Sequence, residues 1–128
     1  MTHPLEQRLG YAFRDPALLT LALTHPSTAK SHNGAAYNNQ RLEFLGDAVL
    51  GLGITQMLYA MYPAESEGDL SKRLVALVNG SQLAQVAQDL QLGEYLVLSH
   101  SEAESGGREL PSNLEDVCEA LLGALFLD

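Results

Sequence analysis

Two close pairs of carboxylates are the feature of this sequence that most directly suggests chemistry. Glu43 and Asp47 are four residues apart. Asp116 and Glu119 are three apart. Residues at these spacings share one face of an α-helix, where like charges repel unless solvent, a cation or a partner compensates them. The pairs therefore predict either two solvated acidic faces or one site at which the two faces meet.

A site formed by both pairs would favour a hard divalent cation. Four carboxylates in a partly buried site repel one another strongly. Oxygen ligands without sulfur or nitrogen favour Mg²⁺, with Mn²⁺ as a substitute, over Zn²⁺. The sequence has no Cys and His cluster with zinc spacing, no glycine-rich phosphate loop before a helix and no recognisable arrangement around a serine or cysteine nucleophile. We therefore expect a Mg²⁺ site if the two faces meet.

The first acid pair lies in an apolar segment that we expect to form a long helix over residues 39–61, closed by Pro63. Its apolar residues recur at spacings of three and four, as on one helix face: Leu42, Leu45, Val49 and Leu52. Glycines at positions 46, 51 and 53 each cost a helix about 1 kcal/mol relative to alanine. We therefore expect another segment to pack closely against this helix.

The second acid pair follows a pattern typical of a helix start. Ser112 and Glu115 have the spacing of a capping box, which would give Glu115 a structural role outside the site. Cys118 lies about 200° around the helix from Asp116, which predicts a small core residue rather than a ligand. Val117 and the apolar residues after it are expected to face the core.

The remaining elements are also predicted to be helical, which indicates an all-α domain spanning residues 1–128. Expected helices cover residues 5–9, 16–24, 67–78 and 82–92, with Asp15, Ser66 and Ser81 as start signals.

Residues 27–38 and 99–111 are expected to be loops, and the second of these is expected to be mobile. Residues 95–98 form an apolar run without an obvious partner strand. His25, before Pro26, is predicted to be a capping or satisfied core histidine.

Length and composition indicate one globular domain and exclude several classes of protein. The chain has 128 residues, of which 46% are hydrophobic and 18% charged, which is ordinary for a globular domain. A single cysteine cannot form an internal disulfide. The polar start argues against a secretory signal, and no continuous apolar run reaches about 18 residues. We therefore expect a cytoplasmic protein without a membrane partner.

The charge balance, taken alone, argues against a nucleic-acid partner. The net charge is −9, with only seven Lys and Arg residues, whereas binding to a phosphate backbone depends on basic side chains. Bound divalent cations would offset part of this negative charge. Lys72 and Arg73 are the only adjacent basic pair and are the candidates for phosphate contact.

One uninterrupted run gives a specific resemblance to a known family. Residues 41–47 read Arg-Leu-Glu-Phe-Leu-Gly-Asp, which resembles the signature of the ribonuclease III family, metal-dependent endonucleases that cut double-stranded RNA. Leu-Thr-His-Pro-Ser at 23–27 and Glu-Gly-Asp-Leu-Ser at 67–71 resemble further segments of this family. Residues 114–124 resemble its second acidic helix. The resemblance covers in effect the whole chain, in family order.

The resemblance implies the helical-bundle fold of the family's endonuclease domain and phosphodiester hydrolysis, with 5′-phosphate and 3′-hydroxyl products, in rRNA and mRNA processing. It implies that both acid pairs hold the metal and that Asp47 and Glu119 are the essential catalytic acids. Gln40 stands where bacterial members often have Glu; it keeps hydrogen bonding and loses a charge. The candidates to support the metal ligands or to contact RNA are Gln40, Glu67, Lys72 and Arg73.

The resemblance also implies a homodimer whose two active sites cut opposite strands of the duplex. Phe44 corresponds to a phenylalanine that the family buries across the two-fold interface. The family usually carries a basic double-stranded-RNA-binding domain after this one, so we expect residues 1–128 to be a fragment. Two alternatives remain: a non-catalytic RNA-binding or ribosome-associated scaffold, as in relatives that lack the acids, and a plain helical dimerisation module.

Overall fold

Helices form nearly all of the regular structure in residues 2–128, the part of the chain that this computed structural model describes. This confirms the predicted all-α class. The only sheet in the described chain is a two-stranded hairpin. In chain order the elements are α1 (Pro4–Leu9), α2 (Pro16–Leu23), the 3₁₀ helix η1 (Pro26–Thr28), β1 (Ser31–His32), β2 (Ala35–Ala36), α3 (Gln40–Met61), α4 (Glu67–Val78), α5 (Gly80–Asp89), the 3₁₀ helix η2 (Leu92–Tyr95), α6 (His100–Glu104) and α7 (Pro111–Leu127).

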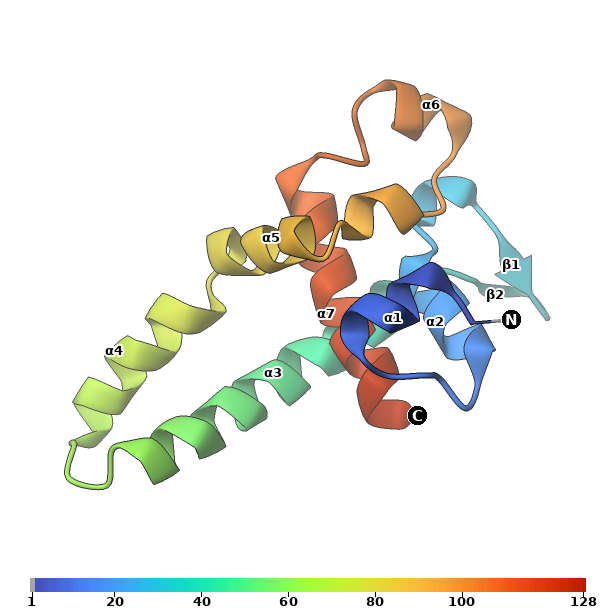
Figure 1. Ribbon diagram of the computed structural model, residues 1–128. Coiled ribbons are helices and arrows are strands. Elements are labelled where there is room, and N and C mark those ends of the chain that lie inside the picture. The colour runs from blue at the N-terminus through green and yellow to red at the C-terminus, as the bar shows by residue number, and fades with distance from the viewer. Residues whose placement is uncertain (1) are drawn as a thin grey trace.

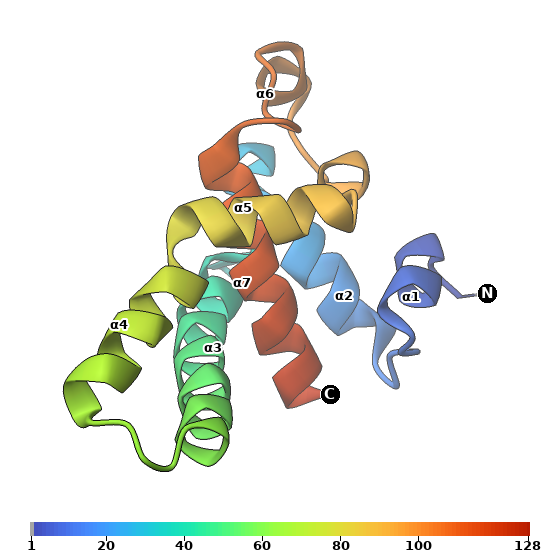
Figure 2. The same ribbon diagram turned by 60° about the vertical axis from the view of Figure 1, so that its left-hand side comes forward.

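Helix α7 lies at the centre of the molecule, and the other long helices pack around it (Figure 1). α3 crosses α7 on one side, α5 lies across α7, and α2 packs against it as well (Figure 2). α3 and α4 form a hairpin that extends away from this centre in both views. Only the first half of α3, which carries the first acid pair, therefore packs against α7.

The hydrophobic core is built on one face of α7. Val117, Ala120 and Ala124 are fully buried there and pack with Leu5 of α1 and Leu92 of η2, among others. Cys118 is buried in the same cluster, as predicted. Burial raises the pKa of the Cys118 thiol to about 11, because a thiolate is poorly solvated in an apolar environment. Cys118 is therefore a core residue.

Two predicted helix starts are confirmed and two are wrong. The Asp15 and Ser66 side chains cap α2 and α4 by accepting backbone N–H groups. Asn79, rather than Ser81, caps α5 by accepting the N–H of Gln82. No side chain caps α7, which begins at Pro111, so the expected capping box of Ser112 and Glu115 is absent. Proline at the first helical position, with its preset φ, starts α7 instead.

The predicted loops contain short ordered elements. Residues 27–38 include part of η1 and the β1–β2 hairpin, whose turn residues Asn33 and Gly34 both have positive φ, at 52° and 78°. This conformation suits a tight hairpin turn, for which Asn-Gly is a preferred sequence. α6 lies within residues 99–111, so that segment is not entirely a loop. Val97 forms an isolated parallel bridge with Thr24 rather than a strand in a sheet.

Helix α3 is unusually apolar for a helix so open to solvent. Over its 22 residues it is long and apolar enough, by length and composition, to cross a membrane, and it is the only such helix among the described residues. Its continuous apolar runs are short, so only its mean hydropathy, taken over many residues, reaches the level of a membrane span. Five large apolar side chains of α3 are exposed: Phe44, Leu52, Met57, Tyr59 and Met61. α4 adds Val75 and Leu77 to the exposed apolar surface of the hairpin.

Two glycines allow α3 and α7 to approach closely. A Cβ atom on Gly46 would overlap the backbone carbonyl of Glu119, and one on Gly123 would overlap the carbonyl of Leu42. The close packing expected at the glycines of α3 is thus found at Gly46, where the neighbour is α7 of the same chain. A Cβ atom on Gly51 or Gly53 would have no neighbour within 4 Å, so these two glycines are not part of the crossing.

The crossing predicts opposite effects for two glycine substitutions on one helix. Gly46→Ala should lower the free energy of unfolding by roughly 3 kcal/mol, because the backbone of α7 must move to admit the methyl group. Gly53→Ala should raise it by up to about 1 kcal/mol, through helix propensity. Urea unfolding of both variants provides the measurement. Equal effects of the two substitutions would show that the crossing is not sterically constrained.

Candidate active site

The crossing of α3 and α7 brings the two acid pairs together. The carboxyl group of Glu43 lies close enough to that of Asp116 for each to affect the other's pKa. The carboxyl group of Asp47 in the same way affects the pKa of Glu119. Each of these pairs joins one acid of α3 to one acid of α7. Of the two arrangements that the sequence left open, two separate solvated faces and one shared site, the structure has the shared site.

The four acids differ in their exposure. Glu119 is buried, with 8% of its surface exposed, while Glu43 and Asp116 are half-buried and Asp47 is exposed. The site is therefore an acidic cluster with a closed side at Glu119 and an open side at Asp47.

Burial and mutual repulsion make two of these acids hard to ionise. Burial, followed by the nearby Asp116, raises the pKa of Glu43 to about 7. Burial and the hydrogen bond with Asp47 raise the pKa of Glu119 to about 7 as well. Burial also raises the pKa of Asp116, although its hydrogen bond with Glu43 opposes this effect. Glu43 and Glu119 therefore resist ionisation more than ordinary glutamates do.

Glu115 is an acid near the site that sequence reasoning assigned elsewhere. Its negative charge contributes to the raised pKa of both Glu43 and Glu119. Its carboxylate lies at the start of α5, 2.5 Å from where a Cβ on Gly80 would be. The spurious capping-box pattern hid this residue, although its spacing of four from Glu119 matches that of Glu43 and Asp47. Such a repeated spacing is the signal that could have identified it.

The remaining candidate residues lie outside the acidic cluster. Gln40 is the exposed first residue of α3, and Glu67 is the exposed first residue of α4, at the end of the hairpin far from α7 (Figure 1). Lys72 is exposed. The guanidinium of Arg73 makes two 2.7 Å hydrogen bonds to Glu65 and lies 3.7 Å from the centre of the Tyr62 ring. Arg73 therefore stabilises the α3–α4 hairpin in this structure.

Phe44 lies beside an apolar groove rather than in the core. It is 83% exposed. The groove has a volume of about 710 Å³. Its lining comes from α2, the segment before α3, the start of α3 and the end of α7: Leu18, Leu21, Ala36, Tyr37, Asn38, Gln40, Arg41, Leu42, Phe44, Leu45 and Leu127. Phe44 therefore does not pack in the core of its own chain.

The donor set suits a hard cation, although the side chains are paired in this structure. No three His, Cys, Asp or Glu side chains within residues 2–128 are arranged to hold one metal ion together. The four acids instead lie in two neighbouring pairs, each with one acid from α3 and one from α7. Their chemistry, however, is that of a Mg²⁺ or Mn²⁺ site, with carboxylate oxygens only and an open side to solvent. The residues present therefore fit such an ion by type and proximity.

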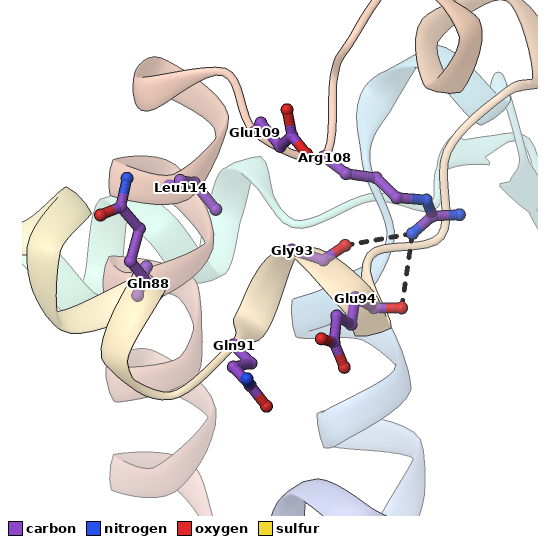
Figure 3. A pocket seen from close by; sticks show the side chains of 8 residues that line it. Gln88, Gln91, Gly93, Glu94, Arg108, Glu109 and Leu114 are labelled. Atoms are coloured by element: carbon purple, nitrogen blue, oxygen red, sulfur yellow. Dashed lines mark hydrogen bonds between the residues drawn. The ribbon is translucent and has the colours of Figure 1, made fainter.

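A second cavity lies between α5, η2 and the segment before α7 (Figure 3), and its lining includes none of the four acids of the cluster. It has a volume of about 280 Å³, and Gln88, Gln91, Glu94 and Arg108 contribute polar side chains to its lining. The Arg108 guanidinium donates to the carbonyls of Gly93 at 3.1 Å and Leu96 at 2.7 Å. Arg108 thus tethers this segment to η2, which is a structural role.

Comparisons with known proteins identify the family. The model of the Ribonuclease-III-like family matches residues 15–128. A Ribonuclease 3 of Anaplasma phagocytophilum is 51% identical over 93% of this chain and 49% of its own length. One of Heliobacterium modesticaldum is 52% identical over 98% of this chain and 54% of its own. The chain thus spans about half the length of the curated relatives it matches.

Solved structures agree with this match. The nuclease domain of ribonuclease III from Campylobacter jejuni superposes with a TM-score of 0.87 at 47% identity, covering 96% of this chain and 82% of that one. Dicer from Pichia stipitis gives a TM-score of 0.64 at 27% identity, over 89% of this chain and 45% of its own. The resemblance found in the sequence is confirmed: the chain belongs to the ribonuclease-III-like family and has the fold of its nuclease domain.

Proposed function

We propose that this chain is a Mg²⁺-dependent endonuclease domain that hydrolyses double-stranded RNA to 5′-phosphate and 3′-hydroxyl ends, in cytoplasmic rRNA and mRNA processing. The meeting of four carboxyl groups at the crossing of α3 and α7 carries this proposal. Solvated surface acids would keep ordinary pKa values, whereas Glu43 and Glu119 have pKa values of about 7. Strongly perturbed acids on the open side of a fold are typical of a functional site.

The proposed metal ligands are the two acid pairs: Glu43, Asp47, Asp116 and Glu119. Their oxygen-only chemistry supports Mg²⁺, with Mn²⁺ as a substitute. When bound, the ion would supply Lewis-acid stabilisation of the charge that develops on the phosphodiester. Burial of Glu119 would hold the ion's ligands in place on the closed side. The exposure of Asp47 leaves room for a phosphate on the open side.

Proton handling is assigned to the pair of Asp47 and Glu119. The pKa of Glu119, about 7, lies near physiological pH. An acid with such a pKa can accept and return a proton under working conditions. Asp47, on the solvent side, would orient the attacking water, and Glu119 in its ionised form would accept the proton that the water loses. We therefore assign the catalytic role to these two residues, as in the family pattern.

We further propose that the active form is a homodimer. Phe44 and the other exposed apolar side chains of α3 support this, since a large apolar surface on a folded chain usually marks an interaction site. In a two-fold interface each Phe44 would enter the groove beside α3 on the other chain. A solved relative, the nuclease domain from C. jejuni, is described as having a region involved in dimer formation. Two chains would supply one acidic cluster for each strand of the duplex.

The assignment of the catalytic acids predicts loss of cleavage when either acid is made neutral. Asp47→Asn and Glu119→Gln should each reduce the rate of duplex-RNA cleavage at least about 10³-fold, because each removes a proposed ligand and proton acceptor. Gel assays on a labelled duplex in Mg²⁺ provide the measurement. Glu104→Gln, at an exposed acid paired only with His100, is the matched control and should cleave at the wild-type rate. Near-normal turnover by the Asp47 or Glu119 variants would refute the proposal.

The raised pKa values predict that the metal-free protein loses stability as pH rises. Glu43 and Glu119 have pKa values of about 7 in the folded chain, against an ordinary 4.5. The folded state therefore binds more protons than the unfolded state between these values, and the free energy of unfolding falls across this window. The lowered pKa values of Glu65 and Asp128 act below it. Thermal melting in chelator from pH 5 to 8 measures the effect.

Binding of metal should reverse this loss of stability at higher pH, since a ligand that binds only the folded state stabilises it. At pH 7.5, millimolar Mg²⁺ or Mn²⁺ should raise the melting temperature, and Asp116→Asn should blunt the rise. Glu119→Gln should weaken the pH dependence in chelator, because it removes one titrating group. A melting temperature that ignores both ions in the wild type would contradict a metal site at this cluster.

The dimer proposal predicts that removing the Phe44 ring weakens association. Truncating an interface aromatic to alanine typically costs about 2 kcal/mol or more, so Phe44→Ala should weaken dimerisation at least about 30-fold. Sedimentation velocity over a range of protein concentrations measures the change. Phe126→Ala, at another exposed aromatic that lies on α7, is the control. A wild-type monomer at tens of micromolar protein, or a Phe44→Ala dimer as tight as wild type, would sink the idea.

A further inference from the structure

His25 links the end of α2 to the first turn of α7. Its Nδ1 atom accepts the backbone N–H of Ser27 at 2.9 Å, which caps η1. This confirms the predicted capping role. Its Nε2 atom lies 3.0 Å from Oδ1 of Asn113. Because Nδ1 is an acceptor, a neutral ring carries its proton on Nε2 and donates it to the amide oxygen.

Asn113 completes a fully paired network inside the protein. It is only 7% exposed. Its Nδ2 atom donates to Oε1 of Glu102 at 3.1 Å and to the carbonyl of Gly107 at 3.0 Å. With its oxygen facing His25, the amide has a single orientation that satisfies every partner. A buried network of this kind, fully satisfied, specifies one arrangement of the segments it joins.

The network lies in the first turn of α7. The residue before α7, Leu110, provides no side-chain cap, and Asn113 supplies side-chain hydrogen bonds there instead. Asp116 follows Asn113 by three residues, which is about one turn of helix. The His25–Asn113 bond therefore adjoins the proposed metal ligands.

The same short segment also anchors the start of α3. The buried Asn39, which precedes α3, donates its backbone N–H to the carbonyl of Thr24 at 2.9 Å and its side-chain amide to the carbonyl of Ala22 at 3.2 Å. Residues 22–25 thus contact the beginnings of both acid-bearing helices. The distance between the two acid pairs is set at one end by this segment and at the other by the glycine crossing.

We propose that His25 and Asn113 are positioning residues for the metal site: they hold the first turn of α7 so that Asp116 and Glu119 face the acids of α3. The proposal rests on the proposed function. Groups that orient metal ligands without touching the ion typically contribute 10–100-fold to metal affinity. His25 and Asn113 would therefore control the affinity for Mg²⁺ more than the rate of the step that follows binding.

The test measures Mg²⁺ affinity in two independent ways on His25→Ala and Asn113→Ala. The Mg²⁺ concentration at half-maximal increase in melting temperature gives affinity without any cleavage, and the half-maximal concentration for cleavage gives it during turnover. Both should rise about tenfold. The cleavage rate at saturating Mg²⁺ should change by less than about threefold. His25→Gln, which retains an N–H donor near the position of Nε2, should recover most of the affinity.

Asp128→Ala is the matched control, because Asp128 anchors the opposite end of α7. Its carboxylate accepts the backbone N–H groups of Arg14 and Asp15, both at 2.9 Å, and the Tyr11 hydroxyl. This variant should melt at a lower temperature with an unchanged Mg²⁺ midpoint. If the Mg²⁺ midpoint of Asp128→Ala rose as much as that of His25→Ala, general destabilisation would explain both results. That outcome would overturn the proposal.

The possible failures can be told apart. If Mg²⁺ does not raise the melting temperature of the wild type, the proposed metal site and this proposal both fail. If the wild type responds but His25→Ala and Asn113→Ala keep its midpoint, only the positioning role fails. Should Asn113→Ala not fold, His25→Ala decides the question, since it removes a half-buried ring and a single bond to α7.

Discussion

The close crossing of α3 and α7 is the constraint on which the rest of the structure depends. It is possible only because Gly46 and Gly123 each present a bare backbone to a carbonyl of the other helix. Neighbouring positions on the same two helices carry the acids, so the crossing that buries Leu42 and the core face of α7 also brings the acid pairs together. The contacts that pack α3 against α7 therefore also determine the geometry of the acidic cluster. A substitution that moves the crossing is expected to move the acids as well.

Bringing four acids together has an energetic consequence that the fold must offset. The pKa values of Glu43 and Glu119 are raised to about 7, so the repulsion within the cluster grows as the pH rises through that value. The apolar core on the other face of α7 and the hydrogen bonds at both its ends hold the helix in place against this repulsion. Electrostatic strain of this kind at a candidate functional site is expected to be offset by stabilising contacts elsewhere in the fold.

Periodicity and local signals predicted most of this fold. The long helix of residues 40–61, the starts at Pro16 and Glu67 and the core role of Cys118 follow from patterns within a few residues of each position. The misassigned features depended on tertiary context. Ser112 and Glu115 match a capping box, but the helix begins at Pro111, two residues earlier than a cap at Ser112 would place its start, and Glu115 lies beside the acids. The Asn113 network was not foreseeable, since its partners lie at residues 25, 102 and 107 and no spacing rule connects them.

The uneven surroundings of α3 explain why one helix can serve two purposes. Its first half is covered by α7 and carries the acids, while its second half extends with α4 beyond the core and leaves Leu52, Met57 and Tyr59 exposed. The apolar residues that make α3 as hydrophobic as a membrane span thus fall into two groups. Some pack inside the protein, and the others are exposed on its surface. Phe44 is an exposed apolar residue in the first half, one residue from Glu43 but about 100° around the helix. A second chain docking on Phe44 would bear on the helix that holds Glu43 and Asp47, so such docking would be linked mechanically to the geometry of the acidic cluster through α3.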